Sequence, residues 1–303
     1  MLIEDIPVEF QPVYKSTYPE YSDGYHIEEN MYKYFQTIKD DISSNFIYLP
    51  VFWTSYYIMN GYGDKIDKLY NWLETLDPNK QYFSVIQYAA GLFIRKPMPN
   101  LLLFSTGGGM NTKKTCYKTE QYYGVERVVF HGNPAKYNIP LLCSPSFPCD
   151  NLQRRIFCSF IGRYDTHACR FTMKDVLQQH NDVVFVDSAG FHRYRELLNT
   201  SIFTLAPRGH GYTSFRLFEA IAAGSIPVYI WEKHRILPYE EEIDWNEFSI
   251  VIHSCELDTL YSKMKSCNVE KMQSALRKVA PLFTYNGCIQ YMKRILIQNP
   301  TTS

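Results

Sequence analysis

The chain has 303 residues, 46% hydrophobic and 20% charged, a composition typical of globular proteins with an ample core. Lys and Arg number 31 and Asp and Glu also 31, so the net charge is zero, without the positive excess of a general nucleic-acid binder. No apolar run reaches the roughly 18 residues of a membrane span and the acidic, proline-broken N-terminus is unlike a signal peptide, so we expect a soluble, cytoplasmic protein of two domains.

The first half predicts a loose alternation of helices and strands. Apolar spacing at Ile27, Met31 and Phe35 predicts a helix over residues 26–35. A second, amphipathic helix is predicted over 66–76, and Trp53-Thr54-Ser55 is predicted as a loop. Strands are predicted over 46–52, 82–88, 100–104 and 127–130. Four prolines between residues 133 and 150 indicate a linker, which places the domain boundary near residue 145.

The second half alternates strands and helices more regularly. Strands are predicted over 155–161, 182–186, 202–206, 226–230 and 248–252. Helices are predicted over 168–180, 192–199, 215–223, 257–265, 271–278 and 287–297. Such alternation indicates a parallel sheet covered by helices on both faces. We therefore expect an α/β protein of two domains separated by a cleft.

Polar loops follow two of the predicted strands in the second half, and a helix N-terminus lies after one of them. Gly162-Arg163 follows the first strand, and Pro207-Arg208-Gly209 follows the third. Ser214, Arg216 and Glu219 then occupy the start of a helix. Ligands of parallel sheets bind beyond the carboxyl ends of the strands, and helix N-termini beside guanidinium groups attract phosphate. We expect a diphosphate site there, although Arg216 and Glu219, three residues apart, could instead form a simple surface pair.

Several familiar ligand motifs are absent from the sequence. Gly209-His210-Gly211 begins a dinucleotide fingerprint, but Ser214 stands where its third glycine belongs. The chain has no G-K-[ST], no D-x-D and no C-x-x-C, so a P-loop, a metal held by such acids and a zinc site are disfavoured. We expect arginines and a helix dipole, without a metal or other cofactor, to meet the diphosphate charge.

Two consecutive stretches, APRGHGYTSFRLFEAIAAGSIPVYI and LPYEEEIDWNEFSIVI, resemble the signature of exostosin-type glycosyltransferases, family 47, which have the GT-B fold. Upstream, CSFIGRYDTHACR and SNFIYLPVFW are similar to further family motifs. The resemblance is strong over 155–252 and diffuse over 10–145. It implies two Rossmann-like domains facing a cleft: an acceptor-side domain, 1–145, and a nucleotide-sugar domain, 146–303, whose last helix could pack back on the first.

The resemblance also implies an activity, namely transfer of a sugar from a UDP-linked donor to a glycan or glycoconjugate hydroxyl, commonly without metal. By position, the donor-binding residues would be Arg163, Arg208, Gly209, Ser214, Arg216 and Glu219. The first two would meet the diphosphate, the glycine would let the backbone approach, and the glutamate would bind the ribose. Arg170 is a weaker member, and a charge on the helix surface is an equal reading of it.

The sequence differs from the family mainly in the residues expected to supply the general base. Relatives carry a His-Asp pair where this chain has Thr106-Gly107-Gly108-Gly109. An inverting mechanism needs a carboxylate or imidazole within reach of the acceptor hydroxyl. Glu28 and Glu29, in a segment similar to the family's early Y-x-x-E, are the expected catalytic residues, with Asp23, His26 and His131 as further candidates. Each of these side chains could equally be solvated or structural.

Three functions therefore stay open. The first is a metal-independent, inverting UDP-sugar transferase with a neutral donor sugar such as xylose or galactose, since no extra basic residue is assigned to a carboxylate on the sugar. The second is a non-catalytic exostosin-like glycan-binding or scaffold protein, which the missing His-Asp pair favours. The third is another nucleotide-binding α/β protein. Family members of animals and plants usually carry a Golgi anchor, which this sequence lacks; a cytoplasmic enzyme or a shortened form would account for that.

Overall fold

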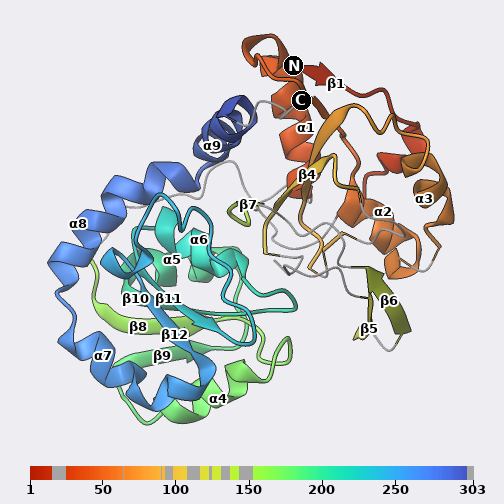
Figure 1. The fold of residues 1–303 in the computed structure, drawn as a ribbon. Coiled ribbons are helices and arrows are strands. Elements are labelled where there is room, and N and C mark those ends of the chain that lie inside the picture. Colours follow the sequence, from red (N-terminus) through yellow and green to blue (C-terminus); the bar gives the residue numbers. More distant parts are fainter. Residues whose placement is uncertain are drawn as a thin grey trace. The chain divides into compact units, whose positions relative to one another are not determined.

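The computed structural model describes residues 1–15, 25–63, 65–89, 91–92, 98–107, 117–122, 125–130, 137–142 and 153–298. The chain divides into two compact units, each described by itself (Figure 1). The first comprises residues 1–139 together with 289–303, and the second comprises residues 140–288. Among the described residues, no helix is both long and apolar enough to cross a bilayer.

The first unit is built on a parallel sheet with the strand order β1-β2-β3-β4-β7. Its strands are β1 (Leu2–Ile3), β2 (Phe46–Tyr48), β3 (Gln81–Ile86), β4 (Leu101–Ser105) and β7 (Tyr137–Asn138). Its helices are α1 (Ile27–Ile38), α2 (Trp53–Met59), α3 (Asp67–Leu73) and the part of α9 (Tyr285–Gln298) from Ile289 onward. β5 (Tyr117–Tyr122) and β6 (Val125–Phe130) form a separate antiparallel hairpin.

Helix α1 covers the sheet as its apolar spacing predicts. Ile27, Met31 and Phe35 are fully buried at intervals of four residues, which places them on one face of the helix. The ring of Phe35 lies 4.8 Å from that of Tyr48 in β2 and 5.4 Å from that of Phe83 in β3, measured between centroids. Aromatic packing against the neighbouring strands therefore fixes the orientation of α1, including its polar first turn.

Two predictions in the first unit are wrong in detail. The strand predicted over 46–52 ends at Tyr48, because Pro50 has no N–H to donate to a ladder. The loop predicted at residues 53–55 is instead the first turn of α2. Trp53 is fully buried and its indole nitrogen donates to Ser84 Oγ at 2.8 Å, so a tertiary contact starts the helix. The strand predicted over 127–130 is confirmed, but as one arm of the β5–β6 hairpin.

The second unit holds a parallel sheet with the order β12-β11-β10-β8-β9. Its strands are β8 (Ile156–Ile161), β9 (Val183–Val186), β10 (Ser201–Pro207), β11 (Ile226–Trp231) and β12 (Ile250–His253). Its helices are α4 (Cys169–Leu177), α5 (Phe191–Thr200), α6 (Phe215–Ala222), α7 (Leu260–Ser266), α8 (Val269–Val279) and the start of α9. The predicted α/β class, with a Rossmann-like parallel sheet in each of two units as in the GT-B fold, is confirmed.

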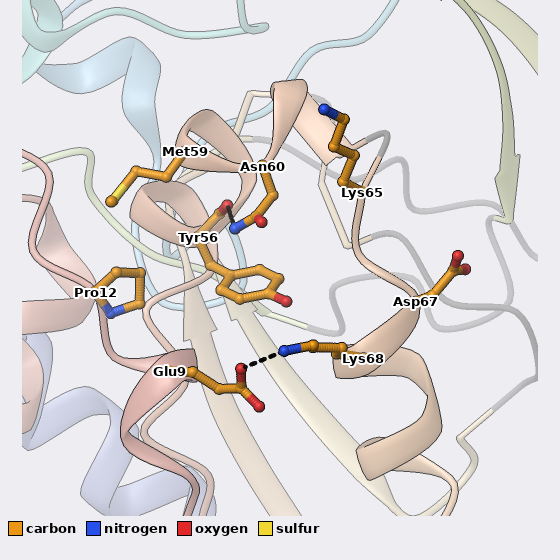
Figure 2. Close-up of a pocket in the computed structure, with 8 residues that line it drawn as sticks. All are labelled: Glu9, Pro12, Tyr56, Met59, Asn60, Lys65, Asp67 and Lys68. Carbon is orange, nitrogen blue, oxygen red and sulfur yellow. Dashed lines mark hydrogen bonds and ion pairs between the residues drawn. The ribbon is translucent and has the colours of Figure 1, made fainter.

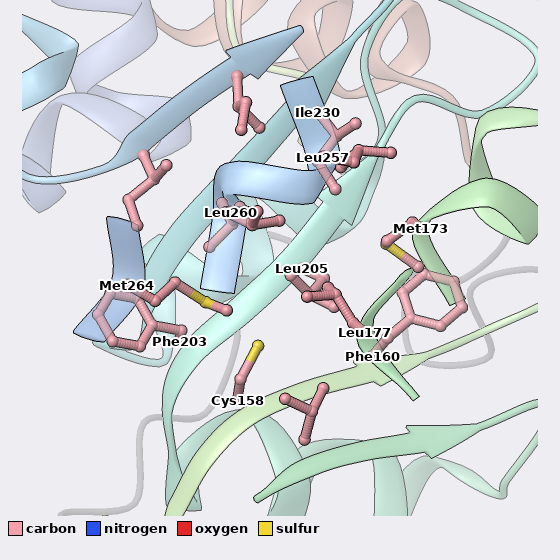
Figure 3. Close-up of a cluster of buried hydrophobic side chains, with 14 of the residues drawn as sticks. Cys158, Phe160, Met173, Leu177, Phe203, Leu205, Ile230, Leu257, Leu260 and Met264 are labelled. Carbon is pink, nitrogen blue, oxygen red and sulfur yellow. The ribbon is translucent and has the colours of Figure 1, made fainter. Parts of the chain in front are cut away.

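The core of the second unit lies between its sheet and helices α4 and α7 (Figure 3). Cys158 and Phe160 project from β8, while Leu260 and Met264 project from α7, all at 1% exposure or less. Burying a side chain of this size contributes roughly 1.5–3 kcal/mol. This packing holds the sheet rigid, and because β8, β10 and β11 are parallel, the loops that follow them emerge at one edge.

Candidate functional site

The loop between β10 and α6 ends in two buried hydroxyls. Ser214 occupies the N-cap of α6 with extended backbone angles, φ −147° and ψ 153°, as predicted. Its side chain nevertheless makes no capping bond, and the hydroxyl oxygens of Ser214 and Thr213 are both buried without a hydrogen-bond partner among the described residues. Buried polar groups are normally satisfied, and the first N–H groups of a helix have no partner within it. This helix end is therefore suited to an anionic ligand.

Two buried arginines lie at the same end of the unit. Arg208 donates to the backbone oxygens of Glu232 and His210, at 3.4 and 3.3 Å, and its guanidinium lies 4.5 Å from the Tyr212 ring centroid. Arg216 lies over the Phe160 ring, at 4.7 Å. Both are at most 7% exposed, and the Nε atom of each is buried with no hydrogen-bond partner in the part of the chain that the structure describes.

These contacts satisfy the two guanidinium groups incompletely. Among the residues that the structure describes, carbonyl oxygens and ring faces hold the two cations, and neither forms an ion pair with a carboxylate. A buried charge that lacks an opposite charge is costly, so such groups are normally paired or bind a charged ligand. The arrangement is therefore complementary to an anion.

Gly162, directly after β8, makes room for Arg216. Its φ is +145°, a conformation that residues with a Cβ rarely adopt. A Cβ at this position would lie 2.2 Å from Nη2 of Arg216. The glycine of the first loop is therefore required for the arginine of α6 to lie across it, and the two sequence motifs meet in space.

Arg170 corrects one of the sequence readings. It is not a charge on the surface of α4, since only 5% of it is exposed. Its guanidinium donates to the backbone oxygens of Arg163 at 2.7 Å, Arg208 at 3.0 Å and Pro207 at 3.4 Å. It thus ties the loop after β8 to the loop after β10. Gly209 lies against it, because a Cβ there would be 3.3 Å from Arg170 Nη2.

Arg163 takes part in this arrangement through its backbone only. Its side chain is 74% exposed and pairs with Asp165, with Nε 3.0 Å from Oδ1. The hydrogen bond and charge of Asp165 raise the pKa of Arg163, which is cationic in any case. The structure therefore brings together Arg208, Gly209, Ser214 and Arg216, while the Arg163 side chain points to solvent.

Glu219 lies one turn beyond Arg216 along α6 and is 3% exposed. It accepts a hydrogen bond from the hydroxyl of Tyr194 on α5 rather than pairing with Arg216, so the surface-pair reading is wrong. Burial raises the pKa of Glu219 to about 8. In the absence of ligand the protonated form is thus favoured at neutral pH.

This shift makes the stability of the protein depend on pH. The pKa of Glu219 is about 8 when folded and near its ordinary 4.5 when unfolded. The unfolded state therefore releases its proton first, and stability is lost as pH rises from about 4.5 to 8. We expect Glu219→Gln to lose less stability than the wild type over this range, by a few kcal/mol. Urea unfolding at pH 5 and pH 8 measures this, and parallel loss in both proteins would contradict it.

The sequence reading missed four polar side chains near these loops. The hydroxyl oxygens of Tyr164 and Thr166 are buried and find no hydrogen-bond partner among the residues that the structure describes. His167 lies 3.2 Å from Glu232, between Nε2 and Oε2. Burial and the charge of Arg208 lower the pKa of His167, and burial and Arg170 lower that of His210. All four occur within or beside the motifs quoted above; Tyr164 is buried, Thr166 and His167 are partly buried, and His210 is exposed.

The first unit contains a separate polar cluster around Glu28 and Glu29 in the first turn of α1. Both are buried, with 1% and 2% exposure. Glu28 Oε1 accepts from Thr54 Oγ1 at 2.7 Å, from the Thr54 amide at 3.3 Å and from the Gln87 amide at 2.9 Å. Glu29 Oε1 accepts from Ser55 Oγ at 2.6 Å. The second oxygen of each carboxyl is buried and has no hydrogen-bond partner in the described ranges.

These contacts exclude one sequence reading of the pair, that of two solvated carboxyls. The carboxyls are not solvated; they lie where β2 leads into α2 and where β3 ends, at the carboxyl edge of the sheet. Burial and the neighbouring Glu29 raise the pKa of Glu28, which favours its protonated form. Two other candidates, Asp23 and His131, lie outside the described residues, as do Gly108 and Gly109.

A hollow of about 420 Å³ lies beside the same helix, α2, on the surface of the first unit (Figure 2). Its lining residues are Glu9, Pro12, Tyr56, Met59, Asn60, Lys65, Asp67 and Lys68. Lys68 and Glu9 form an ion pair at 3.3 Å, and Tyr56 follows directly on Ser55 in the chain. Charged and amide groups around an aromatic ring and a thioether could contact a hydroxylated ligand by both hydrogen bonding and packing.

Across the described residues, no three His, Cys, Asp or Glu side chains are grouped to hold a metal ion.

Comparison with known proteins gives a family match centred on the second unit. The exostosin GT47 domain matches residues 107–267. Exostosin-1b of Danio rerio is 36% identical over 101 residues, 31% of this chain and 13% of that protein. The exostosin-1 homolog of Caenorhabditis elegans is 48% identical over 59 residues, 20% of this chain and 15% of that protein. The chain thus matches less than a sixth of the length of these relatives.

Solved structures show a more distant likeness. An α-glucosyltransferase in complex with UDP and DNA has a TM-score of 0.43 and 11% identity, with 88% of this chain and 83% of that chain covered. A GtfA/B complex has a TM-score of 0.43 and 9% identity, with 90% of this chain and 61% of that chain covered.

Proposed function

Because the matched residues, 107–267, make up more than half of the chain, the chain belongs to the exostosin GT47 family, and we propose that it is a glycosyltransferase that uses a UDP-sugar donor. The observation that carries this proposal is the set of buried, unpartnered polar atoms at the start of α6. They are Arg208 Nε, Arg216 Nε, Thr213 Oγ1 and Ser214 Oγ. Two cations and two hydroxyls at a helix N-terminus match a diphosphate in charge and in hydrogen bonding.

The donor would lie across this end of the second unit. Arg208 and Arg216 meet the diphosphate, and Gly209 lets its backbone approach. Glu219, one turn along α6, accepts the ribose hydroxyls; a buried carboxyl already bonded to the Tyr194 hydroxyl is suited to bind another hydroxyl. The Arg163 side chain could contact the diphosphate only after its ion pair with Asp165 breaks, so we expect it to contribute less to donor binding than Arg208 and Arg216. The family and the quoted motif support uridine as the base.

As the bond to the sugar breaks, negative charge develops on the leaving diphosphate. Fixed guanidinium groups and the α6 dipole are placed to stabilise it, as a preorganised electrostatic site does. We therefore propose transfer without a metal, with inversion, and from a neutral sugar such as xylose or galactose. The acceptor is a glycan or glycoconjugate hydroxyl, for which the hollow beside Tyr56 is a candidate contact surface.

Calorimetry tests the proposal directly. We expect UDP, at up to millimolar concentration, to bind the wild type in preference to NAD and ATP. Arg208→Ala removes one of the two buried cations and should weaken UDP binding at least about tenfold, since hydrogen bonds to charged groups contribute roughly 1.5–3 kcal/mol. Absence of UDP binding, or an unchanged affinity in Arg208→Ala, would refute the site.

Transfer separates the enzyme from the non-catalytic alternative. A thermal-shift screen of UDP-sugars selects the donor, and mass spectrometry of products from a panel of glycosides then reports transfer. Unchanged transfer in EDTA is expected for the metal-independent reaction. UDP binding without hydrolysis or transfer across the panel would instead favour a glycan-binding or scaffold role.

A further inference from the structure

Helices α5 and α6 begin at the same edge of the second unit's sheet. Each connects two parallel strands, α5 from β9 to β10 and α6 from β10 to β11, so each starts at the carboxyl ends of the strands. Tyr194 is the fourth residue of α5 and Glu219 is the fifth residue of α6. Both residues therefore lie about one turn from the edge at which ligands of parallel sheets bind.

Small side chains bring these two helices together. Ala220 of α6, Ala223 directly after it and Leu198 of α5 form a buried cluster, and the ring of Tyr194 packs against it (Figure 1). The distance between packed helices depends on the side chains at their contact, and alanine adds only a methyl group. The Tyr194 hydroxyl thus reaches across from α5 and donates to Oε2 of Glu219.

This hydrogen bond restricts the orientation of the Glu219 carboxyl. A glutamate side chain has several rotatable bonds, and staggered arrangements remain open to it unless a contact selects one of them. The hydroxyl of Tyr194 selects the arrangement that places Oε2 against α5. Two carboxyl oxygens offer more acceptor sites than one tyrosine uses, so Glu219 can still accept from ribose hydroxyls.

We propose that Tyr194 is a positioning residue for ribose recognition, and that through Glu219 it makes the donor site select ribonucleotides over deoxyribonucleotides. The inference rests on the proposed function, in which Glu219 accepts the ribose hydroxyls. Tyr194 does not touch the ligand and acts through the carboxyl alone. Because Glu219 is oriented before the donor binds, less conformational freedom is lost on binding.

Calorimetry with two ligands isolates the contribution of the ribose. UDP and 2′,3′-dideoxy-UDP differ only in the two ribose hydroxyls. We expect the wild type to bind UDP at least about tenfold more tightly, because the dideoxy analogue leaves a buried acceptor without its partner. Equal affinity for the two ligands would show that the site does not recognise the ribose, and would overturn the inference.

Tyr194→Phe removes only the hydroxyl and keeps the ring that packs on α6. UDP should bind about three- to tenfold more weakly, as expected for one hydrogen bond, while the affinity for the dideoxy analogue stays within about twofold. The preference for UDP then falls by the same factor. A purely structural role of Tyr194 would instead weaken both ligands equally. That result, or an unchanged preference, would contradict positioning.

Tyr261→Phe is the matched control. The Tyr261 hydroxyl also donates to a carboxyl, that of Asp182, at 3.1 and 3.2 Å. Asp182 directly precedes β9 and therefore lies at the opposite edge of the sheet. The same chemical change should leave both the UDP affinity and the preference over the dideoxy analogue as in the wild type.

A double variant tests whether Tyr194 acts through Glu219. Glu219→Leu introduces an apolar side chain of similar size and should abolish the preference for UDP. Adding Tyr194→Phe should then weaken UDP binding no further, since the group through which the tyrosine acts is already gone. A further loss would mean that Tyr194 contacts the ligand directly. If Glu219→Leu does not fold, the two-ligand comparison in Tyr194→Phe still decides the question.

The two levels of proposal fail differently. If the wild type does not bind UDP, the proposed function falls and the ribose inference falls with it. If the wild type binds UDP and Arg208→Ala weakens that binding, while Tyr194→Phe keeps the full preference for UDP, only the role of Tyr194 is wrong.

Discussion

Arg216→Met is expected to abolish most UDP binding while leaving the unliganded protein at least as stable as the wild type. In the unliganded protein Arg216 is a buried cation that lies over the Phe160 ring, and its Nε has no hydrogen-bond partner among the described residues. Replacing a buried charge by an apolar side chain of similar volume is often neutral or stabilising by about 1–4 kcal/mol. Met is flexible and unbranched, so it fills the same space beside Gly162.

The affinity of the same variant should move in the opposite direction. Losing one partner of a desolvated charge pair costs about 2–5 kcal/mol, which corresponds to at least about a 30-fold weaker Kd. Calorimetry with UDP and urea unfolding, run on the same preparation, measure both effects. Arg277→Met on α8, an exposed position, is the matched control and should change neither. Unchanged UDP affinity in Arg216→Met would show that this arginine does not meet the diphosphate.

Arg170→Ala is expected to lower the free energy of unfolding by about 3 kcal/mol and to weaken UDP binding as well. The substitution leaves the carbonyl oxygens of Arg163, Pro207 and Arg208 without their common donor. Hydrogen bonds to a charged group contribute about 1.5–3 kcal/mol each, and the three share one side chain. Because the loops after β8 and β10 are then no longer tied together, Arg208 and Gly209 lose their fixed positions.

Two further variants sharpen this test. Arg170→Lys keeps the charge but lacks the planar fork that reaches three acceptors, so it should resemble Arg170→Ala. Arg155→Ala removes an arginine that is 70% exposed and paired with Glu196, and should cost less than about 1 kcal/mol. Chemical unfolding and UDP calorimetry distinguish the cases. Normal stability in Arg170→Ala would mean that the loops hold their conformation without the clamp.

Much of the second unit could be predicted from the sequence because its signals are local. Short apolar runs bounded by Gly and Pro predicted β8, β10 and β11, and the capping residue Ser214 and Gly224 marked the two ends of α6. The alternation of strands and helices then predicted that the strands are parallel. Parallel strands place the loops at 162–163 and 207–213 at the same edge of the sheet. The first unit was harder to predict. Trp53 begins a helix rather than lying in a loop, and its indole nitrogen donates to Ser84, 31 residues away.

The roles of single side chains were less predictable, because they depend on contacts between segments distant in the sequence. Arg163 and Arg170 stand in one motif with the same charge, yet one is exposed and the other binds three buried carbonyls. Ser214 is a typical N-cap residue, and its position was right, but its hydroxyl does not cap the helix. No local propensity distinguishes these outcomes, since burial decides them.

The sequence by itself determined the family, the α/β class and the position of the loops that we propose to bind the donor, because periodicity, turn residues and a long motif are properties of contiguous chain. Only the tertiary structure decided which arginines are buried, that burial raises the pKa of Glu219 to about 8, and that Ser55 Oγ contacts both His26 and Glu29. Those properties arise from desolvation and hydrogen bonding between segments tens of residues apart, and neither can be read from neighbours along the chain.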